Sequence, residues 1–147
     1  MTDEQLIEAA RAAALKAYAP YSGFSVGCAI LSEDGELATG ANMENACYRL
    51  GLCAEQSALT TAQHAFGLKR IARIAVAGGN GSGATLSGEQ SVTPCGGCRQ
   101  ALLEASHLAG RDFDILCASG DGTRVERLAL STLIPHGFGP ANLSDAG

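Results

Sequence analysis

The sequence predicts an α/β domain in which one β-sheet lies between layers of helices. Segments rich in β-branched residues alternate along the chain with segments whose apolar residues repeat at helical spacing. This alternation is typical of the fold class. The chain has 147 residues, of which 46% are hydrophobic and 17% charged, enough for one compact core. We find no internal repeat and no linker-like composition shift, so we expect a single domain over residues 1–147.

Apolar periodicity and turn residues place the elements along the chain. Helical spacing predicts three helices and a last helical turn, over residues 2–18, 54–66, 97–107 and 131–134. Runs of apolar residues predict five strands, over residues 24–32, 36–41, 71–77, 113–118 and 123–130. The capping-box pair Thr2 and Gln5 marks the start of the first helix, and Asp34-Gly35 is a hairpin turn. Residues 78–91 are rich in Gly and Ser, so we expect a surface loop there.

Charge and hydropathy exclude several classes of function. The formal net charge of −5 argues against partners bound through many phosphates, so we expect no nucleic-acid binding. No apolar run is long enough for a membrane span, and the start Met-Thr-Asp-Glu lacks the basic and apolar segments of a secretory signal. We therefore expect no membrane association and a cytoplasmic location. The low charge density also favours a surface that is partly covered by sister subunits.

Three cysteines and one glutamate carry the clearest chemical pattern. Cys95 and Cys98 have the spacing at which one metal ion is held from a single turn, and Cys53 can supply a third thiolate of a zinc tetrahedron. Cys53 stands at the start of one predicted helix, and Cys95 and Cys98 stand at the start of another. Helix N-termini favour thiolate over thiol. Glu55 can converge with Cys53 only if that cysteine lies at or before the helix cap. An open fourth corner beside a carboxylate that moves protons indicates hydrolytic chemistry.

Two other interpretations of the cysteine pattern stay open at this point. Cys95-Gly-Gly-Cys98 at a helix start also has the form of a redox pair. A structural zinc site would instead take a fourth protein ligand from a histidine or a spare cysteine. No histidine falls in a paired ligand pattern, so we expect surface, capping or packing roles for His64, His107 and His136. The remaining cysteines are expected to be small buried hydrophobes, namely Cys28, Cys47 and Cys117.

Together with longer motifs, these residues make the chain resemble the cytidine deaminases. Zinc nucleoside and nucleobase deaminases carry Cys-Ala-Glu followed by Pro-Cys-x-x-Cys, as this chain does from Cys53 and Pro94. The motifs run in the family's order and cover nearly the whole chain: Tyr21-Ser-Gly-Phe-Ser-Val-Gly27, Asn42-Met-Glu-Asn-Ala-Cys-Tyr48, Pro94-Cys-Gly-Gly-Cys-Arg-Gln100 and Leu133-Ile-Pro-His-Gly-Phe-Gly-Pro140. The resemblance is to the short, homotetrameric, three-cysteine type. It implies a three-layer α/β/α sandwich with a central mixed β-sheet of about five strands.

The resemblance implies a zinc-dependent hydrolysis. Cys53, Cys95 and Cys98 would hold one Zn²⁺ per subunit, with a water in the fourth position whose pKa zinc lowers from about 16 toward 7. Glu55 would take a proton from that water, protonate ring N3 and later deliver a proton to the departing ammonia. Cytidine and 2′-deoxycytidine would thereby become uridine and 2′-deoxyuridine, a reaction of pyrimidine salvage. Taken alone, Glu55 would instead be a solvated residue of a first helical turn.

The resemblance also implies which residues bind the substrate. Asn42 and Glu44 resemble the family's ribose-binding pair, and their spacing puts both side chains on one face if the backbone is extended. Phe24 resembles the residue that packs against the pyrimidine ring, and the backbone of Ala54 would hydrogen-bond the base. Without the resemblance, Asn42 and Glu44 would be ordinary loop residues and Phe24 a core aromatic.

Members of this type borrow active-site residues from neighbouring subunits. Carried over to this chain, Ala46, Tyr48 and Phe138 would reach into an adjacent subunit's site in a homotetramer. Phe138 stands in a tail rich in Gly and Pro, where a local core is hard to build, and this agrees with a role in another subunit.

Gln56 departs from the family pattern. In three-cysteine members an arginine usually follows the glutamate and hydrogen-bonds the ligand thiolates. Three thiolates and a hydroxide around Zn²⁺ carry a net charge of about −2, which weakens the metal's pull on water. We therefore hypothesise that Arg49 or Arg99 supplies the compensation, with the two helix dipoles and Gln56 itself as further candidates. Cys28 also departs, since a small residue such as alanine is usual there, and we expect it to pack.

Three functions stay in view from the sequence. The leading one is a cytidine and deoxycytidine aminohydrolase. A related enzyme would deaminate another cytosine-bearing compound, such as a nucleoside antibiotic, but Asn42 and Glu44 favour a plain ribose or deoxyribose. The non-enzyme alternative is a zinc-stabilised binding domain, and the acidic charge disfavours a polynucleotide editor.

Overall fold

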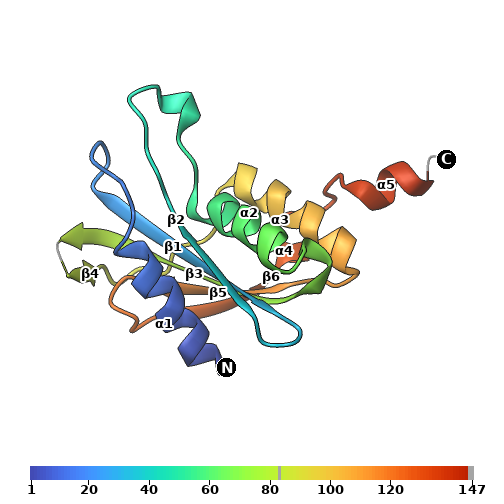
Figure 1. Ribbon diagram of the computed structural model, residues 1–147, viewed down its shortest axis with the longest axis horizontal. Helices are drawn as coiled ribbons and strands as arrows, with labels where there is room; N and C mark the ends of the chain where they lie inside the picture. The colour runs from blue at the N-terminus through green and yellow to red at the C-terminus, as the bar shows by residue number, and fades with distance from the viewer. Residues whose placement is uncertain (83, 146–147) are drawn as a thin grey trace.

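The computed structural model describes residues 1–82 and 84–145, which form a layered α/β fold (Figure 1). Within this part of the chain, six strands form one sheet in the order β2-β1-β3-β5-β6, with β4 paired to β3. The strands are β1 (Phe24–Ser32), β2 (Leu37–Ala41), β3 (Ile71–Ser82), β4 (Thr85–Ser87), β5 (Asp114–Ser119) and β6 (Val125–Ala129). The helices are α1 (Asp3–Ala14), α2 (Ala54–Ala65), α3 (Gly96–Ala109), α4 (Leu130–Leu133) and α5 (Pro140–Asp145), with 3₁₀ turns η1 (Tyr48–Leu50) and η2 (Leu68–Arg70).

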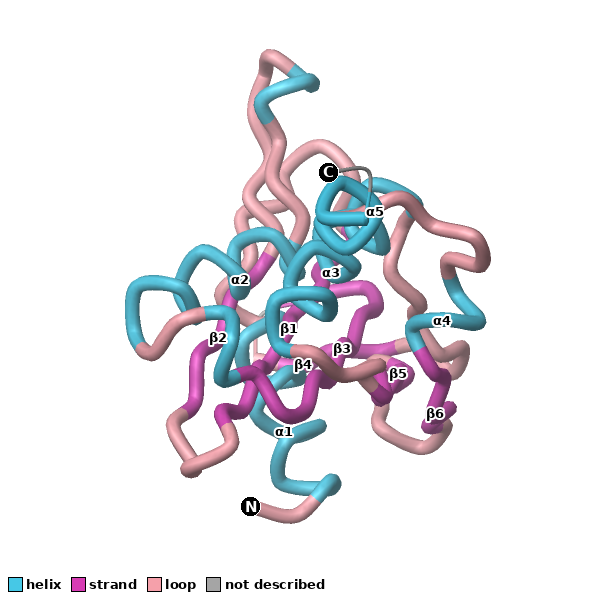
Figure 2. The backbone as a smooth tube through the Cα atoms, turned by 90° about the vertical axis from the view of Figure 1, so that its right-hand side faces the viewer, coloured by secondary structure: helices cyan, strands magenta, loops and turns pink. Residues whose placement is uncertain are grey.

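Helices cover both faces of the sheet. α1 lies on one face, whereas α2 and α3 lie side by side on the other (Figures 1 and 2). β3 and β5 run parallel and the other neighbouring strands antiparallel, so the sheet is mixed. This arrangement confirms the predicted three-layer α/β/α sandwich. Among the described residues, none of the helices combines the length and apolarity needed to span a bilayer.

Alternation along β1 supplies both layers of the core. Cys28 and Ile30 belong to the apolar cluster that α2 and α3 cover, whereas Ala29 and Leu31 belong to the cluster under α1. All four side chains are buried, because successive residues of a strand point to opposite faces of the sheet. A strand buried on both faces therefore appears in the sequence as a continuous apolar run.

Two glycines let helices approach the strands closely. A Cβ on Gly27 would lie 2.0 Å from the carbonyl oxygen of Ala10 in α1. A Cβ on Gly40 would lie 2.4 Å from the backbone nitrogen of Ala58 in α2. Carbon atoms do not approach backbone atoms so closely, so helix packing on each face of the sheet depends on a glycine.

Most predicted elements are present, with ends that shift by a few residues. The capping box forms as predicted: Gln5 N–H donates to Thr2 Oγ1 at 3.2 Å, and Thr2 N–H donates to Gln5 Oε1 at 2.8 Å. β1 matches the predicted strand over residues 24–32. The first helix ends earlier than predicted, because Tyr18 leaves it to pair with Met43. α5 was not predicted, although Pro140 at its first position is a common helix start.

The predicted surface loop over residues 78–91 is wrong for much of its length. β3 continues to Ser82, and β4 pairs with it, placing Asn80 opposite Ser87. The glycines of this stretch suggest a loop in the sequence, but here they permit close strand approach. A Cβ on Gly79 would lie 1.9 Å from the carbonyl oxygen of Ser87. The sheet consequently has six strands rather than about five.

Candidate metal centre and active site

The three predicted cysteine ligands meet at the beginnings of two helices. Cys53 is the N-cap of α2, Cys95 is the N-cap of α3, and Cys98 lies in the first turn of α3. Their sulfur atoms all lie within 4.8 Å of one another, and the Cys53 and Cys95 sulfurs are 3.9 Å apart. Thiolates around a tetrahedral zinc with Zn–S bonds of about 2.3 Å lie about 3.8 Å apart. The three thiols therefore fit one Zn²⁺ per chain.

The composition of this cluster bears on the alternatives left open by the sequence. Within the described residues, the group of potential ligands holds three cysteines and no histidine or carboxylate as a fourth member. A structural site with four protein ligands needs such a member. The geometry instead leaves one corner of the tetrahedron free for a water or a substrate, as in catalytic zinc sites.

The local electrostatics of the thiols are uneven. Burial raises the pKa of the Cys98 thiol, whereas the backbone N–H of Cys98 donates toward the Cys95 sulfur and lowers the pKa of that thiol. At the N-caps of α2 and α3, Cys53 and Cys95 place a sulfur where most helices have a capping oxygen. The first-turn amides of α2 and α3 therefore face the cluster, where they stabilise negative charge.

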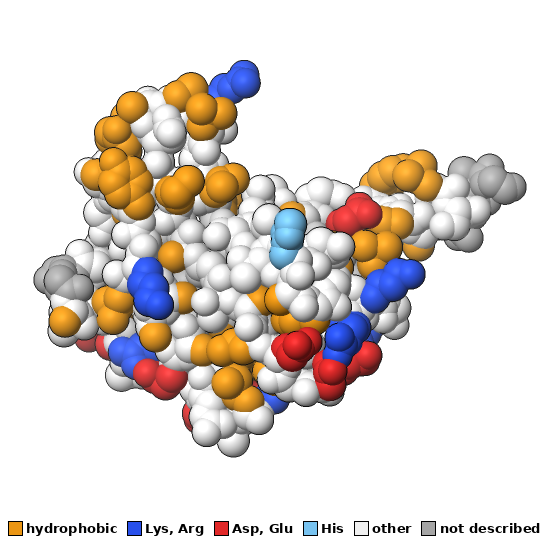
Figure 3. All heavy atoms as spheres, in the orientation of Figure 1, with side chains coloured by type: hydrophobic (Ala, Val, Ile, Leu, Met, Phe, Trp, Pro, Cys, Tyr) orange, Lys and Arg blue, Asp and Glu red, His pale blue; other side chains and the backbone are white. Residues whose placement is uncertain are grey.

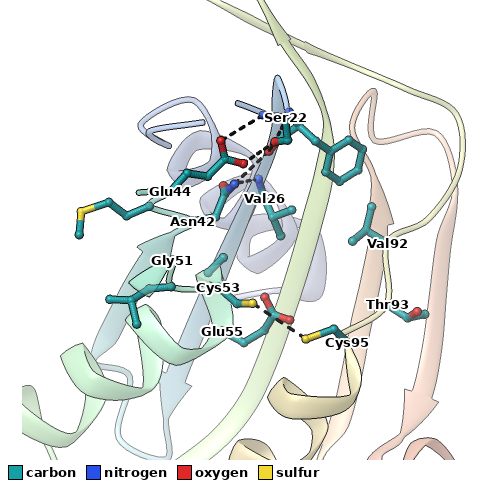
Figure 4. A pocket seen from close by; sticks show the side chains of 14 residues that line it. Ser22, Val26, Asn42, Glu44, Gly51, Cys53, Glu55, Val92, Thr93 and Cys95 are labelled. Carbon is teal, nitrogen blue, oxygen red and sulfur yellow. Dashed lines mark hydrogen bonds between the residues drawn. The ribbon is translucent and has the colours of Figure 1, made fainter. Parts of the chain in front are cut away.

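Glu55 is buried beside the sulfur atoms. It is the second residue of α2, and its side chain is 4% exposed. Figure 4 shows its carboxylate next to the sulfurs of Cys53 and Cys95. The expected condition for this convergence is met, since Cys53 stands at the helix cap. Burial raises the pKa of the Glu55 carboxyl, which suits a group that holds and releases protons.

A cavity of about 400 Å³ opens onto this centre, and its walls bring together most of the predicted site residues. Cys53, Ala54, Glu55 and Cys95 form one side. Phe24 at the beginning of β1 also lines the cavity, as do Asn42 and Glu44 from the segment after β2. Figure 4 shows Asn42 and Glu44 on the side opposite the sulfurs. Segments that are far apart in the sequence therefore share one cavity.

Asn42 is held in place by the backbone of β1. Its side-chain Nδ2 donates to the carbonyl oxygen of Phe24 at 2.9 Å, and its Oδ1 accepts from Val26 N–H at 2.8 Å. A carboxamide has two N–H donors and two lone pairs, so one of each remains available toward the cavity. Asn42 is thus positioned and still able to bind a polar ligand.

Glu44 binds the loop that precedes β1. Its carboxylate accepts from the backbone N–H groups of Tyr21 at 2.9 Å and Ser22 at 3.1 Å, and from Ser22 Oγ at 2.5 Å. The Ser22 hydroxyl and these two amides lower the pKa of the Glu44 carboxyl, so it is ionised at neutral pH. An ionised carboxylate offers about four lone-pair positions, and one remains for a ligand.

Phe24 and Ala54 present an apolar ring and a backbone amide to the cavity. Phe24 opens β1, and its side chain is 40% exposed, more than is usual for a core aromatic. Ala54 is the first residue of α2, and the N–H groups of a first helical turn have no partner within the helix.

The residues predicted to serve a neighbouring subunit lie outside this cavity. Ala46 and Tyr48 belong to residues 43–52, here called the arm, which projects from the body of the fold (Figures 1 and 2). The side chain of Tyr48 is 79% exposed, and its ring meets Tyr21 edge to face at 5.8 Å. Phe138 lies in the tail before α5 and is 61% exposed. Figure 3 shows apolar side chains gathered on the projecting arm.

The three candidates for charge compensation lie in different places. Gln56 Nε2 lies 3.8 Å from the sulfur of Cys98, at hydrogen-bond distance for sulfur. Arg99 binds backbone instead: Nε donates to the carbonyl oxygen of Pro94 at 2.7 Å and Nη1 to that of Leu133 at 2.8 Å. Arg49 lies in η1 on the arm, outside the metal centre of its own chain.

Sequence reasoning gave no role to several residues that line the cavity. Val26, Val92 and Thr93 are among the residues that line it, and Ser22 contributes the short hydrogen bond to Glu44 (Figure 4). Ser22 lies inside a motif that carries the family resemblance, so that signal was present. Val92 and Thr93 come from a segment without a distinctive pattern, and only the fold brings them to the site.

The α/β/α fold and a three-thiol centre with a buried carboxylate define the class of hydrolytic zinc enzymes. A model of the family described as the cytidine and deoxycytidylate deaminase zinc-binding region matches residues 1–109. The cytidine deaminase of Halalkalibacterium halodurans is 35% identical over 145 residues, covering 99% of this chain and 100% of that protein. The chain therefore belongs to the cytidine and deoxycytidylate deaminase family.

Solved structures agree with this assignment. A crystal structure of cytidine deaminase from Burkholderia pseudomallei superposes with a TM-score of 0.81 at 39% identity, covering 94% of this chain and 100% of that one. The cytidine deaminase structure from Mycobacterium tuberculosis gives a TM-score of 0.65 at 36% identity, covering 95% and 99% of the two chains. Both likenesses extend over nearly the full chain.

Proposed function

We propose that this chain hydrolyses cytidine and 2′-deoxycytidine to uridine and 2′-deoxyuridine with release of ammonia, a step of pyrimidine salvage. The observation that carries the proposal is the buried Glu55 carboxylate beside three thiols in one cavity. The cavity volume of about 400 Å³ lies in the range of small-molecule sites. Relatives that match the whole chain bear the name cytidine deaminase.

The nucleophile in this proposal is a water. Cys53, Cys95 and Cys98 would hold a zinc ion, which would supply the Lewis acidity that makes a water acidic near neutral pH. Glu55 accepts the proton of this water and passes it to ring N3 while the water oxygen bonds to C4. The same carboxylate then moves the proton of the new hydroxyl to the exocyclic amine, the C4–N bond breaks, and ammonia leaves.

Asn42 and Glu44 bind the sugar. Each keeps unused hydrogen-bonding capacity toward the cavity after its bonds to the protein backbone. An amide and a carboxylate together accept from and donate to hydroxyl groups, as a ribose or deoxyribose requires. Because β1 fixes the side chain of Asn42 and the loop before β1 fixes that of Glu44, little conformational entropy is lost when the sugar binds.

Phe24 and Ala54 orient the base. The partly exposed ring of Phe24 offers an apolar face for the pyrimidine, and the free first-turn amide of α2 offers a donor at Ala54. Stacking and one backbone hydrogen bond hold the ring with C4 toward the metal centre.

Neutral donors, rather than a guanidinium beside the sulfurs, offset the thiolate charge in this chain. Gln56 contacts the sulfur of Cys98 directly, and the first-turn amides of both helices face the cluster. The charge of Arg99 acts through the loop that carries Cys95, because its hydrogen bonds go to Pro94 and Leu133. Arg49 lies on the arm, so any contribution from it would be made in another protomer.

The active enzyme is a homotetramer with shared sites. Ala46 and Tyr48 on the arm and Phe138 in the tail are exposed and do not line the cavity of their own chain. Exposed aromatic and aliphatic side chains on projecting segments are usual at protein interfaces. In this proposal, each protomer lends these residues to the site of a neighbour.

We further propose that residues 1–147 act as one domain in the cytoplasm. One sheet runs from β2 to β6, and both core clusters draw on strands from the two halves of the chain. All six thiols are free, which agrees with a reducing compartment.

The proposal is tested by following the loss of cytosine-ring absorbance with zinc-replete protein. Cytidine and 2′-deoxycytidine should be converted with release of ammonia, whereas the free base cytosine and deoxycytidine monophosphate should be poor substrates. Free cytosine tests the need for the sugar contacts of Asn42 and Glu44. Absence of turnover on both nucleosides by protein carrying one zinc per chain would contradict the proposal.

A further inference from the structure

The C-terminal tail, here residues 133–145, is bound along one face of α3, the helix that begins at the metal ligands Cys95 and Cys98. Gln100 Nε2 donates to the carbonyl oxygen of Phe138 at 2.8 Å, and Ala141 N–H donates to His107 Nδ1 at 3.1 Å. Arg99 Nη1 donates to the carbonyl oxygen of Leu133. Arg99, Gln100 and His107 lie on one face of α3 and span a little over two turns, so a single helix holds the tail from its beginning to α5.

The tail also packs tightly against this helix. A Cβ on Gly137 would lie 2.6 Å from Leu103 Cδ2, and a Cβ on Gly139 would lie 2.5 Å from the His107 ring. Both glycines flank Phe138, so the backbone at Phe138 is fixed on both sides by contacts that only glycine permits. The main chain at this position is therefore well defined before any partner binds.

The ring of Phe138, in contrast, has no comparable burial in its own chain. It is 61% exposed, and the cavity at the metal centre is lined by residues that all precede position 96. α5 continues away from the body of the fold (Figure 1). A fixed backbone that presents a free aromatic ring is preorganised for a partner, because little entropy remains to be lost on binding.

We propose that Gln100 is a positioning residue, which holds Phe138 of one protomer in the orientation that the substrate cavity of a neighbouring protomer requires. This inference rests on the proposed deaminase with shared sites, and it adds the group that sets the position of the lent ring. A second copy of this chain is the partner because the arm adds an exposed apolar surface of its own, through Met43, Tyr48, Leu50 and Leu52. Gln100 acts on a neighbour's substrate although it lies two residues after Cys98, a ligand of its own metal centre.

Replacing Gln100 by methionine removes the donor and keeps the length of the side chain. Gln100→Met should raise KM for cytidine about threefold to tenfold, with a smaller change in kcat, as expected for the loss of one hydrogen bond that orients a binding residue. Zinc content should stay at one per chain, which separates the effect from damage to the metal centre.

Gln63 provides a matched control on α2. Its side chain also bonds the backbone of the segment that follows its helix, accepting from Leu68 N–H at 3.1 Å, but it lies outside the cavity. Gln63→Met should leave KM unchanged. Equal kinetics for Gln100→Met and wild type would overturn the inference.

A double-mutant cycle tests whether Gln100 acts through Phe138. Phe138→Ala should raise KM by itself, and adding Gln100→Met to it should have no further effect, because the ring that Gln100 positions is gone. Fully additive effects of the two substitutions would show that Gln100 acts by another route and would overturn the assignment.

Mixed assemblies test whether the effect crosses between protomers. Gln100→Met protomers are co-expressed with an excess of Glu55→Gln protomers, which lack the proton carrier but retain a normal tail. Only the Gln100→Met protomers then have an active site that contains Glu55. Most of their neighbours are Glu55→Gln protomers, in which Gln100 still holds Phe138 in place. KM should therefore return to the wild-type value. A KM that stays raised places the action of Gln100 within its own chain and overturns the inference.

Failure of the proposed function can be distinguished from failure of the inference about Gln100. Wild-type protein that is inactive on cytidine, or monomeric by sedimentation, would contradict the deaminase or the shared site, and the inference with it. Wild-type protein that is active and tetrameric, together with unaltered Gln100→Met kinetics, would overturn the inference alone.

Discussion

The two faces of the sheet are built from the same strands but differ in how their helices begin. On one face, α1 starts at Thr2, whose side chain forms a complete capping box with Gln5. On the other, α2 and α3 start at Cys53 and Cys95, whose side chains carry a sulfur and no oxygen. The face under α1 has an apolar core, and Asp3 of α1 pairs there with Arg73 and Arg127 of the sheet. The opposite face places a cysteine where a helix normally has its capping oxygen.

This difference separates stability from chemistry within one small fold. A capped helix start contributes about 1 kcal/mol to stability and leaves few free amides. A start without a capping oxygen leaves its N–H groups and its positive dipole end for other groups, here the three thiols and, in the proposed complex, the base. The predictions that follow test whether substitutions on the two faces have separable effects.

The largest effect is expected from removing a metal ligand. Cys95→Ser should lose zinc, essentially all turnover and part of the stability, because metal binding is linked to folding. Cys117→Ala is the control: Cys117 is buried under α3, its pKa is raised to about 12 by burial, and it lies outside the ligand cluster. Metal analysis and thermal unfolding measure both variants. Equal zinc content in the two variants would contradict the ligand assignment.

The next effect concerns the proton carrier. Glu55→Gln should keep zinc but lose turnover by about 10²- to 10⁴-fold, the contribution of general acid–base catalysis. Glu4 offers a matched control, since it is the second residue of α1 as Glu55 is of α2, but it is exposed on the other face. Glu4→Gln should leave kcat unchanged. Loss of metal from Glu55→Gln would instead make this residue a ligand.

A third prediction concerns the glycines beneath the helices. Gly27→Ala forces a Cβ toward Ala10 in α1 and should lower the free energy of unfolding by about 1–3 kcal/mol, while zinc content and KM of the folded protein stay unchanged. Gly40→Ala moves α2 through its contact with Ala58, so it should reduce both stability and zinc affinity. Urea denaturation and zinc titration separate the two. The same loss of zinc affinity in both variants would refute the division between the faces.

The smallest effect is a pH dependence at Glu44. The Ser22 hydroxyl and two backbone amides hold the pKa of this carboxyl below its unfolded value, so the interaction stabilises the protein above about pH 4.3. It is lost as the pH falls through the lower folded pKa, where the carboxyl takes up a proton. The difference in stability between wild type and Glu44→Gln should therefore be constant from pH 8 to about pH 5 and vanish in acid. A difference that grows in acid would contradict this assignment.

The sequence was sufficient for features that depend on local pattern. The capping box at Thr2 and the strand over residues 24–32 follow from short-range spacing, and the meeting of Cys53, Cys95 and Cys98 follows from two motifs that metal chemistry joins. Residues 78–82 were mistaken for a loop because glycine has the same local signature in a turn as in a tightly approached strand.

Other features depend on contacts between distant segments, which no local pattern encodes. The bond from Gln100 to Phe138 joins residues 38 apart, and the contact of Gln56 with Cys98 joins residues 42 apart. The ring of Phe138 is exposed in its own chain. In the proposed assembly its contacts lie in another protomer, which the structure of one chain does not include.

Cys53 and Cys95 stand 42 residues apart in the sequence and 3.9 Å apart at their sulfurs. A zinc ion between them is therefore also a reversible cross-link that ties α2 to α3. In the chain-entropy description, closing a loop of this length stabilises the folded state by about 4 kcal/mol. Chelators should accordingly loosen the packing of the two helices as well as stop turnover. Zinc binding should therefore determine the stability of the packing between α2 and α3 as well as the activity.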